Sequence, residues 1–338
     1  MNATGPFPRV AAALAVAILC LDGAAAAAPV VIRFSHTAAE DSAKGRAAEY
    51  FKGLAEERTH GRVRVEVFAN STLYGDKDEL EALQLGAVQM LAASLNNFSV
   101  LGVREFEAFE LPYLFQDYEA LHRVTDGPVG AALLATLEPK GIRGLAYWDN
   151  GFKQMSANKP LRLPDDLKGL RMRIRYSSVS EAQMRAVGVS PRVLAYADTF
   201  AALQSGALDG TEHTASFLYA ERLYQVQKYV TLSDHGYLGS AVVVNRRFWE
   251  KLPGDIRAAL EGAMRDATRF ANESARRAND DAIEALKRSG TTVVITLTAE
   301  EKAAWKRAFM KVHRNSQGRI PEQALLSIYS GAGFHAAE

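Results

Sequence analysis

The sequence predicts an α/β fold of two lobes, and three observations support this prediction. Strand-like and helix-like segments alternate along the chain, which is typical of a parallel sheet flanked by helices. A short motif at residues 82–87 returns in similar form at 202–207. An apolar stripe at helical spacing covers residues 255–288, and a helix of that length could pack along both lobes.

The alternation is clearest in the first part of the chain. Residues 30–34, which are apolar except for Arg33, predict a strand, and residues 42–57 carry apolar side chains at helical spacing. Valine alternates with charged residues over 63–67, which is typical of a strand with one buried face. Residues 78–85 predict a second helix. Further strands are expected at 90–93, 145–148, 172–175, 241–244 and 292–297, and a last helix at 299–312.

The repeated motif ends two helical runs in the same way. Residues 82–87 read ALQLGA and residues 202–207 read ALQSGA, with glycine at its favoured place just past a helix end. Two interpretations remain open. The motif is a common helix ending that arose twice, or it marks two α/β lobes of similar build, which usually bind a ligand in the crevice between them.

The long apolar stripe predicts one helix near the C-terminus. Pro253 and Gly254 provide a start signal, and Ser289 and Gly290 an end. A helix over residues 255–288 would be roughly 50 Å long. The alternative is two shorter helices broken near Asn272, where the sequence has neither glycine nor proline.

The N-terminus has the layout of a secretory signal peptide, expected at residues 1–27. Arg9 precedes an apolar run of residues 10–21, and alanines follow that favour cleavage after Ala26 or Ala27. A membrane anchor is the alternative, but a spanning helix needs roughly 20 apolar residues. The single cysteine, Cys20, lies inside this segment and has Leu19 before it. We therefore expect a periplasmic, unlipidated mature protein without disulfides.

Composition and motifs argue against several classes of function. The formal net charge is +1, and it stays +1 when the signal peptide is removed. This balanced charge does not indicate a basic surface for nucleic acid. Nucleotide-binding glycine loops, zinc-protease motifs and nucleophile elbows are missing. Ser233, Asp234 and His235 have the residue types of a triad, but chain neighbours cannot easily converge on one atom. We expect no catalytic residue, metal or cofactor, and a chain that is not an enzyme.

Arginines alternate with apolar residues over 170–175 and offer a candidate site. Arg171, Arg173 and Arg175 fall on one face of the predicted strand. That face is either a solvated sheet surface or a place where an arginine pairs with a carboxylate at the end of a strand. Lys153 likewise follows a strand, although it could be an ordinary exposed lysine.

Seven motifs in a fixed order carry a resemblance to a known family. They lie within about residues 30–333 and so cover essentially the whole mature chain. The chain resembles the substrate-binding proteins of TRAP (tripartite ATP-independent periplasmic) transporters, in particular the C4-dicarboxylate type, the DctP family. The motifs are FSH at 34–36, LQLGAVQM at 83–90, LPYLF at 111–115, WDNGFKQM at 148–155, LKGLRMR at 167–173, LQSGALDG at 203–210 and DHGYLG at 234–239.

The resemblance implies a two-lobed fold like that of periplasmic binding proteins. Hinge strands would join the lobes, and the long C-terminal helix would span both. We expect residues 28–150 plus 240–278 to form one lobe and residues 151–239 plus 279–338 to form the other. The lobes would close over the ligand.

The resemblance also implies the residues of the site. Arg173 matches the family arginine that holds a substrate carboxylate, and Lys153 matches a basic residue in the preceding segment. His213 stands where the family commonly has asparagine, which leaves that contact open. Arg171 and Arg175 fall outside the matched arginine position. Further matches to positions that face the cleft are His36, Lys44, Tyr74, Ser94 and Asn150.

The expected function is the capture of a C4-dicarboxylate such as succinate, malate or fumarate. Arg173 would hold one carboxylate, and Lys153, Lys44 or a polar cluster with His213 the other. The loaded protein, expected to be a monomer, would contact the membrane permease subunits only transiently. Alternatives are the same role for a 2-oxo acid, sugar acid or aromatic acid, an exported enzyme, or a protein that presents ligand to a sensor.

Overall fold

The computed structural model describes residues 1–2, 5 and 28–335. Nearly all of the expected signal peptide, including its cleavage site, lies outside these residues. In the described part of the chain, none of the helices has the length and apolar composition that crossing a bilayer requires.

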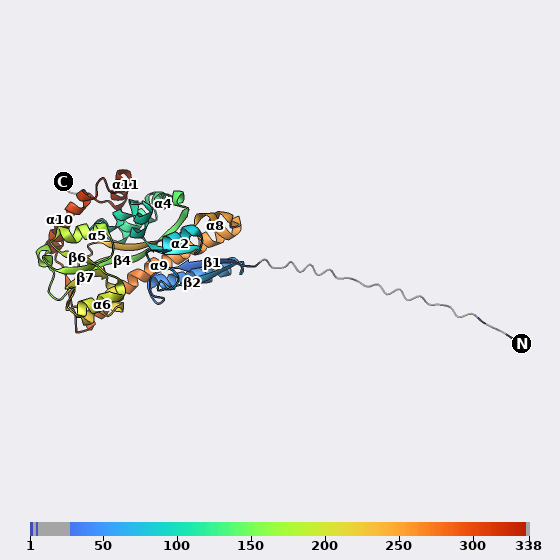
Figure 1. The fold of residues 1–338 in the computed structure, drawn as a ribbon, viewed down its shortest axis with the longest axis horizontal. Helices are drawn as coiled ribbons and strands as arrows, with labels where there is room; N and C mark the ends of the chain where they lie inside the picture. Colours follow the sequence, from blue (N-terminus) through green and yellow to red (C-terminus); the bar gives the residue numbers. More distant parts are fainter. Residues whose placement is uncertain (3–4, 6–27, 336–338) are drawn as a thin grey trace.

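Ten strands form one twisted sheet that runs through the molecule (Figure 1). The order is β2-β1-β3-β9-β4-β7-β5-β6, with β8 beside β4 and β10 beside β8. The strands predicted near 30–34, 63–67 and 90–93 are confirmed. The bounds are β1 (Val30–Ser35), β2 (Val63–Phe68), β3 (Met90–Ser94), β4 (Ile142–Ala157), β5 (Arg171–Ile174), β6 (Ser190–Val193), β7 (Gly210–Thr214), β8 (Tyr229–Leu232), β9 (Tyr237–Asn245) and β10 (Val293–Thr296).

The strand order has an internal symmetry. In one half β1 is parallel to β2 and β3, and in the other half β5 is parallel to β6 and β7. The predicted parallel sheet is therefore correct within each half, but β9 and β4 are antiparallel to β3 and β7 at the centre. Each copy of the repeated motif lies just before β3 or β7, which supports the interpretation of two lobes of similar build.

Helices cover both faces of the sheet and complete the fold. The helices predicted at 42–57, 78–85 and 299–312 correspond to α1, α2 and α10. The α-helices are α1 (Ala43–Arg58), α2 (Glu79–Leu85), α3 (Tyr118–Thr125), α4 (Pro128–Ala135), α5 (Ser178–Ala186), α6 (Tyr196–Gln204), α7 (Ala215–Ala220), α8 (Arg246–Lys251), α9 (Gly254–Arg288), α10 (Ala299–Asn315) and α11 (Glu322–Ala332). The 3-10 helices are η1 (Leu95–Leu101), η2 (Glu105–Glu110), η3 (Glu138–Lys140), η4 (Pro164–Leu167) and η5 (Leu223–Gln225).

Two long elements connect the halves. β4 pairs with β9 along its first part and with β7 and β8 along its end. The helix α9 is continuous over 35 residues, which confirms the prediction of one helix, and it packs against α1 and β4 as well as α7 and β10. Figure 1 shows β1 and β2 at one end of the molecule and β6, β7 and α6 at the other, with β4 and α9 between them.

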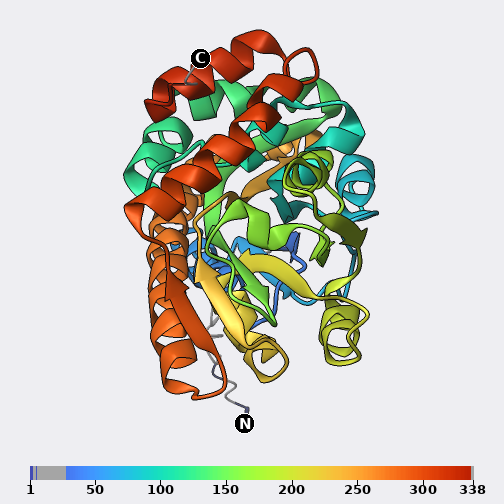
Figure 2. The same cartoon turned by 90° about the vertical axis from the view of Figure 1, so that its left-hand side faces the viewer.

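The C-terminal helices return across the molecule, as the red ribbon in Figure 2 shows. α10 contacts α5, whereas α11 packs on α3, α4 and η2. α11 thus contributes Leu325 and Ile328 to the apolar core that holds Phe106 and Phe109. Residues 322–332 therefore lie beside elements of the predicted lobe 28–150, although the sequence grouped 279–338 with the other lobe. The remaining domain boundaries stay a prediction.

Candidate functional site

The sheet brings the ends of its parallel strands together at the middle of β4. Ser94, at the end of β3, pairs with Ser240, which in turn pairs with Trp148 on β4. Thr214, at the end of β7, pairs with Lys153 on the same strand. Since ligands of α/β sheets bind beyond the carboxyl ends of strands, the two halves of this sheet point to one shared site.

The space between the halves is closed in this structure. Asn96 in η1 donates a hydrogen bond from Nδ2 to the carbonyl of Tyr176 at 3.1 Å. Ser177 donates from Oγ to Oε2 of Glu110, at the end of η2, at 2.5 Å. These contacts join the segment that follows β5 to the 3-10 helices of the other half, so side chains between them are shielded from solvent.

Arg173 is buried at the edge of this closed space. Only 3% of the residue is exposed, and Nε donates to the carbonyl of Leu194 at 2.9 Å. The guanidinium lies over the Tyr196 ring, 4.1 Å from its centroid. No carboxylate of the described residues lies within salt-bridge distance, and burial lowers the pKa of this arginine. Arg173 is therefore a buried cation that lacks an anionic partner.

The neighbouring arginines have different surroundings. Arg171 is half exposed and paired with Asp209, from Nη2 to Oδ1 at 2.8 Å. Arg175 is largely buried, with its guanidinium 5.9 Å from the Tyr196 ring centroid and 4.0 Å from Oδ2 of Asp76. The interpretation of a solvated face therefore holds for Arg171 and is wrong for Arg175.

His213 contacts the same tyrosine and is held as a neutral ring. The backbone N–H of Thr214 donates to Nδ1 at 2.9 Å, which places the proton of a neutral ring on Nε2, 3.3 Å from the Tyr196 hydroxyl. The ring stacks on Phe217. Burial, followed by the charges of Arg173 and Arg175, lowers the pKa of His213 well below its usual value. His213 can therefore donate a hydrogen bond but adds no charge at neutral pH.

Lys44 and His36 come from the opposite half. The Lys44 ammonium makes one long hydrogen bond, 3.4 Å to the carbonyl of Ala92, and burial lowers its pKa to about 8. His36 is fully buried, and both ring nitrogens lack a partner among the described residues. Burial and then the charge of Lys44 lower the pKa of His36 to about 4. Lys44, like Arg173, has no carboxylate of the described chain within salt-bridge distance.

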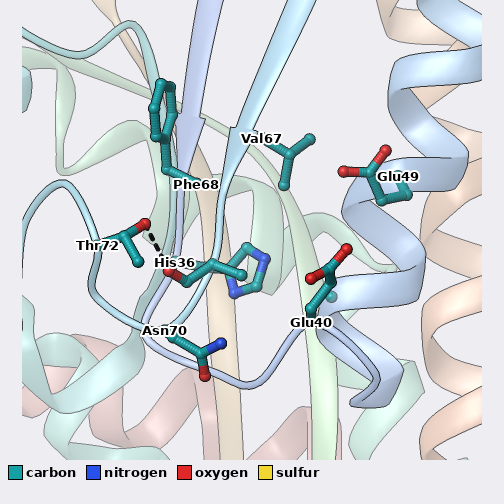
Figure 3. A pocket seen from close by; sticks show the side chains of 9 residues that line it. His36, Glu40, Glu49, Val67, Phe68, Asn70 and Thr72 are labelled. Carbon is teal, nitrogen blue, oxygen red and sulfur yellow. Dashed lines mark hydrogen bonds between the residues drawn. The ribbon is translucent and has the colours of Figure 1, made fainter.

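Two open cavities lie away from the cluster around Tyr196. The smaller, about 240 Å³, contains His36 as its only predicted site residue (Figure 3). The larger, about 1150 Å³, lies between α3, α4 and α9 and contains none of them. The small cavity is lined by His36, Glu40, Gly45, Glu49, Val67, Phe68, Ala69, Asn70 and Thr72.

Lys153 belongs to a separate buried network. Its ammonium lies 3.0 Å from Oε1 of Glu212 and 3.1 Å from Oγ of Ser180. The other oxygen of Glu212 is 2.7 Å from Nε2 of His235. Burial raises the pKa of Glu212, but the Lys153 and His235 contacts outweigh burial and hold that pKa well below its usual range. Lys153 is thus already neutralised inside the protein, unlike Arg173 and Lys44.

The same network brings together Ser233, His235 and Glu212 in the pattern of a triad. Ser233 Oγ and His235 Nδ1 are 2.8 Å apart, but Asp234, the third residue of the sequence pattern, takes no part and pairs with Lys302. Both residues are fully buried, and the His235 ring packs beside Trp305 and Phe309. The serine hydroxyl has no open path to a substrate here, and the arrangement orients Glu212 toward Lys153.

The remaining predicted residues lie nearby with fewer contacts. Ser94 is buried where β3 ends, opposite Ser240, whose hydroxyl has no partner among the described residues. Asn150 lies at an irregularity of β4, and its carbonyl accepts a hydrogen bond from Asn279 at 2.8 Å. Tyr74 is half buried against the core near α2.

Burial shifts the pKa of two acidic groups close to the cations. Burial raises the pKa of Glu79 to about 7 and also raises the pKa of Glu110. Among the described acids, only Asp76 comes within 4.0 Å of the cluster of Lys44, Arg173 and Arg175, and it does so at Arg175. Such a cluster can bind an anion through charge-assisted hydrogen bonds. The described residues contain no group of three or more metal-ligating side chains.

Sequence reasoning set Arg175 aside and assigned no role to Tyr196 and Glu212. A usable signal existed for Arg175, because it continues the alternation that marks Arg173. No such signal existed for Tyr196 or Glu212. Tyr196 is 17 residues from its partner His213, and Glu212 is 59 residues from its partner Lys153, so only the fold brings each pair together.

The sequence matches the family model of the bacterial extracellular solute-binding proteins, family 7, over residues 34–319. It is 53% identical over 310 residues to the C4-dicarboxylate-binding periplasmic protein DctP of Rhodobacter capsulatus, covering 92% of this chain and 93% of that protein. A TRAP periplasmic solute-binding protein of Shewanella oneidensis with bound succinate has a similar structure, with a TM-score of 0.85, 37% identity, and coverage of 90% of this chain and 100% of that one. The corresponding protein of Pseudomonas aeruginosa PAO1 with bound L-malate has a TM-score of 0.81, 43% identity, and coverage of 85% and 100%.

Proposed function

The chain belongs to the DctP family, the family 7 bacterial extracellular solute-binding proteins of TRAP transporters, and we propose that it captures a C4-dicarboxylate between its two lobes. The observation that carries this proposal is the pair of buried cations without a carboxylate partner. Arg173 comes from β5 in one half of the molecule and Lys44 from α1 in the other. A buried unpaired charge is costly, and a ligand carboxylate would remove that cost.

The choice of a C4-dicarboxylate rests on charge and on similarity. Cations on both sides of the closed space match an acid with a carboxylate at each end. The related protein of Rhodobacter capsulatus is named for binding C4-dicarboxylates, and the two similar structures hold succinate and L-malate.

Capture needs no bond chemistry in this proposal. The dianion enters the open cleft, Arg173 pairs with one carboxylate, and closure removes water and strengthens each charged hydrogen bond. Such bonds contribute about 1.5–3 kcal/mol each. A few of them are consistent with a micromolar Kd, about −8 kcal/mol, after the costs of ordering.

The protein is exported to the periplasm with its signal peptide removed, and it works as a monomer without a cofactor or catalytic turnover. The closed, loaded form contacts the membrane permease subunits transiently and delivers the ligand for uptake. The hinge strands β4 and β9 and the helix α9 are the elements that would guide closure.

Two variants of neighbouring arginines test the proposal. A thermal-shift assay of the protein from Ala28 onward should show stabilisation by succinate, malate or fumarate, because a ligand that binds only the native state raises Tm. Arg173→Ala should abolish that shift while the ligand-free Tm stays near wild type. Arg171→Ala is the matched control, since Arg171 is half exposed and paired with Asp209, and the Tm shift with succinate should persist in it.

Other outcomes have distinct meanings. A shift with sugar acids, 2-oxo acids or aromatic acids alone would keep the transport role and replace the substrate. An undiminished succinate shift in Arg173→Ala would contradict the role of Arg173.

A further inference from the structure

Arg175 is the cation in the closed space whose hydrogen-bonding needs are least satisfied. A guanidinium carries several N–H donors and cannot lose its charge at ordinary pH. The Arg175 side chain is 15% exposed, and it makes no hydrogen bond with the residues that the structure describes. Its nearest carboxylate oxygen, on Asp76, is 4.0 Å away, which is too long for a hydrogen bond.

The position of Arg175 connects the two halves. It stands directly after β5, one residue beyond Ile174, and shares the Tyr196 ring with Arg173. Its charged neighbours Asp76, Glu79 and Glu110 come from the opposite half, and so does Lys44, whose pKa its charge helps to lower. The side chain therefore faces across the cleft.

The nearby acids do not satisfy this guanidinium. Asp76 accepts a hydrogen bond from Asn97 Nδ2 at 3.0 Å and is partly exposed. Glu79 accepts from the same amide at 2.9 Å. Burial raises the pKa of Glu79 to about 7 and raises that of Glu110, which is already bonded to Ser177. The N–H donors of Arg175 make no hydrogen bond to these acids and are therefore available to a ligand carboxylate.

We propose that Arg175, together with Lys44, forms the subsite for the second carboxylate and makes the protein selective for dicarboxylates over monocarboxylates of equal length. This inference rests on the proposed function and deepens it. Arg173 takes the first carboxylate, and Arg175, over the same tyrosine ring, takes the second with Lys44 from the opposite half. Lys153 stays with Glu212 and contacts neither carboxylate.

Succinate and butyrate provide a matched pair of probes, because both have four carbons and only succinate has the second carboxylate. In isothermal titration calorimetry at neutral pH, Arg175→Gln should weaken succinate binding by roughly 100-fold, the loss of two charged hydrogen bonds. The weak affinity for butyrate should change little, so the selectivity ratio should collapse. Arg171→Gln, the control, should keep both affinities.

Two further variants separate a carboxylate subsite from a purely structural role of Arg175. Arg175→Lys keeps the charge but loses the planar fork, so its succinate affinity should lie between those of wild type and Arg175→Gln. Arg175→Lys also serves as the test variant if Arg175→Gln fails to fold. Asp76→Asn tests whether Arg175 acts only as a latch on Asp76. If Arg175 acts only as a latch, Asp76→Asn should weaken the binding of both succinate and butyrate. If Arg175 forms a carboxylate subsite, Asp76→Asn should keep the wild-type affinity for succinate.

The results that overturn the inference are distinct from failure of the proposed function. Three outcomes would refute the subsite while dicarboxylate capture stands. They are a succinate affinity of Arg175→Gln within a few-fold of wild type, equal losses of affinity for succinate and butyrate in that variant, and a matching loss of affinity in Asp76→Asn. Failure of the wild-type protein itself to bind any dicarboxylate would refute the proposed function and this inference together.

Discussion

Lys153 and Arg173 are both buried cations, but only one of them has an anionic partner. Lys153 lies 3.0 Å from Glu212, and Arg173 has a carbonyl and an aromatic ring instead. From the sequence, both matched basic positions of the family, with Arg173 expected to hold one carboxylate and Lys153 a candidate for the other. The partner of Lys153 comes from a strand distant in sequence, so only the fold shows that the Lys153 ammonium is already in an ion pair.

This difference predicts a stability effect for Lys153. Lys153→Met should destabilise the ligand-free protein by about 3–5 kcal/mol, because it leaves Glu212 buried without its cation. The double variant Lys153→Met with Glu212→Gln should recover part of the loss, since it removes the stranded charge. Urea unfolding at neutral pH measures both effects. An unchanged free energy of unfolding in Lys153→Met, with loss of succinate binding, would make Lys153 a ligand contact instead.

At the scale of elements, the crossing strand β4 shows the limit of apolar patterns. The sequence predicted a strand at 145–148, but β4 covers Ile142–Ala157. Its polar segment Asp149-Asn150-Gly151 interrupts the apolar pattern, and the pairing with β9 shifts register there. β7 was missed for a similar reason, since its polar residues are all buried within hydrogen-bonded networks. Strands with continuous apolar residues, such as β3 and β9, were found readily.

The irregular point of β4 carries a prediction of its own. Gly151 has φ of 127°, and an added Cβ would lie 2.5 Å from Nδ2 of Asn279 on α9. Gly151→Ala should therefore destabilise the protein by roughly 2–4 kcal/mol through backbone strain and the displaced Asn279 side chain. Gly53→Ala in α1 is the control, because its Cβ would meet open space and alanine favours a helix.

Denaturant unfolding of the two glycine variants measures this effect. We expect Gly151→Ala to unfold at lower denaturant than wild type and Gly53→Ala at the same or higher denaturant. Equal stability of the two variants would show that the contact between β4 and α9 at this point tolerates a side chain.

At the scale of the whole molecule, two lobes joined by crossing strands explain why the site is assembled from distant parts of the chain. The repeated motif left two interpretations open, and the symmetric strand order agrees with the one that gives two lobes of similar build. The sequence did not predict that the central strands are antiparallel, because apolar runs do not reveal strand direction. It also did not place α11 across the other half, since that packing depends on a return of the chain through α10.

The central claim is that the closed space holds a dicarboxylate between cations from both halves. A crystal structure of the protein from Ala28 onward with succinate tests it most directly. We expect one carboxylate on Arg173, the other on Arg175 and Lys44, and Lys153 still paired with Glu212. Succinate bound outside the space between the halves, or a carboxylate on Lys153 with Glu212 turned away, would contradict the account.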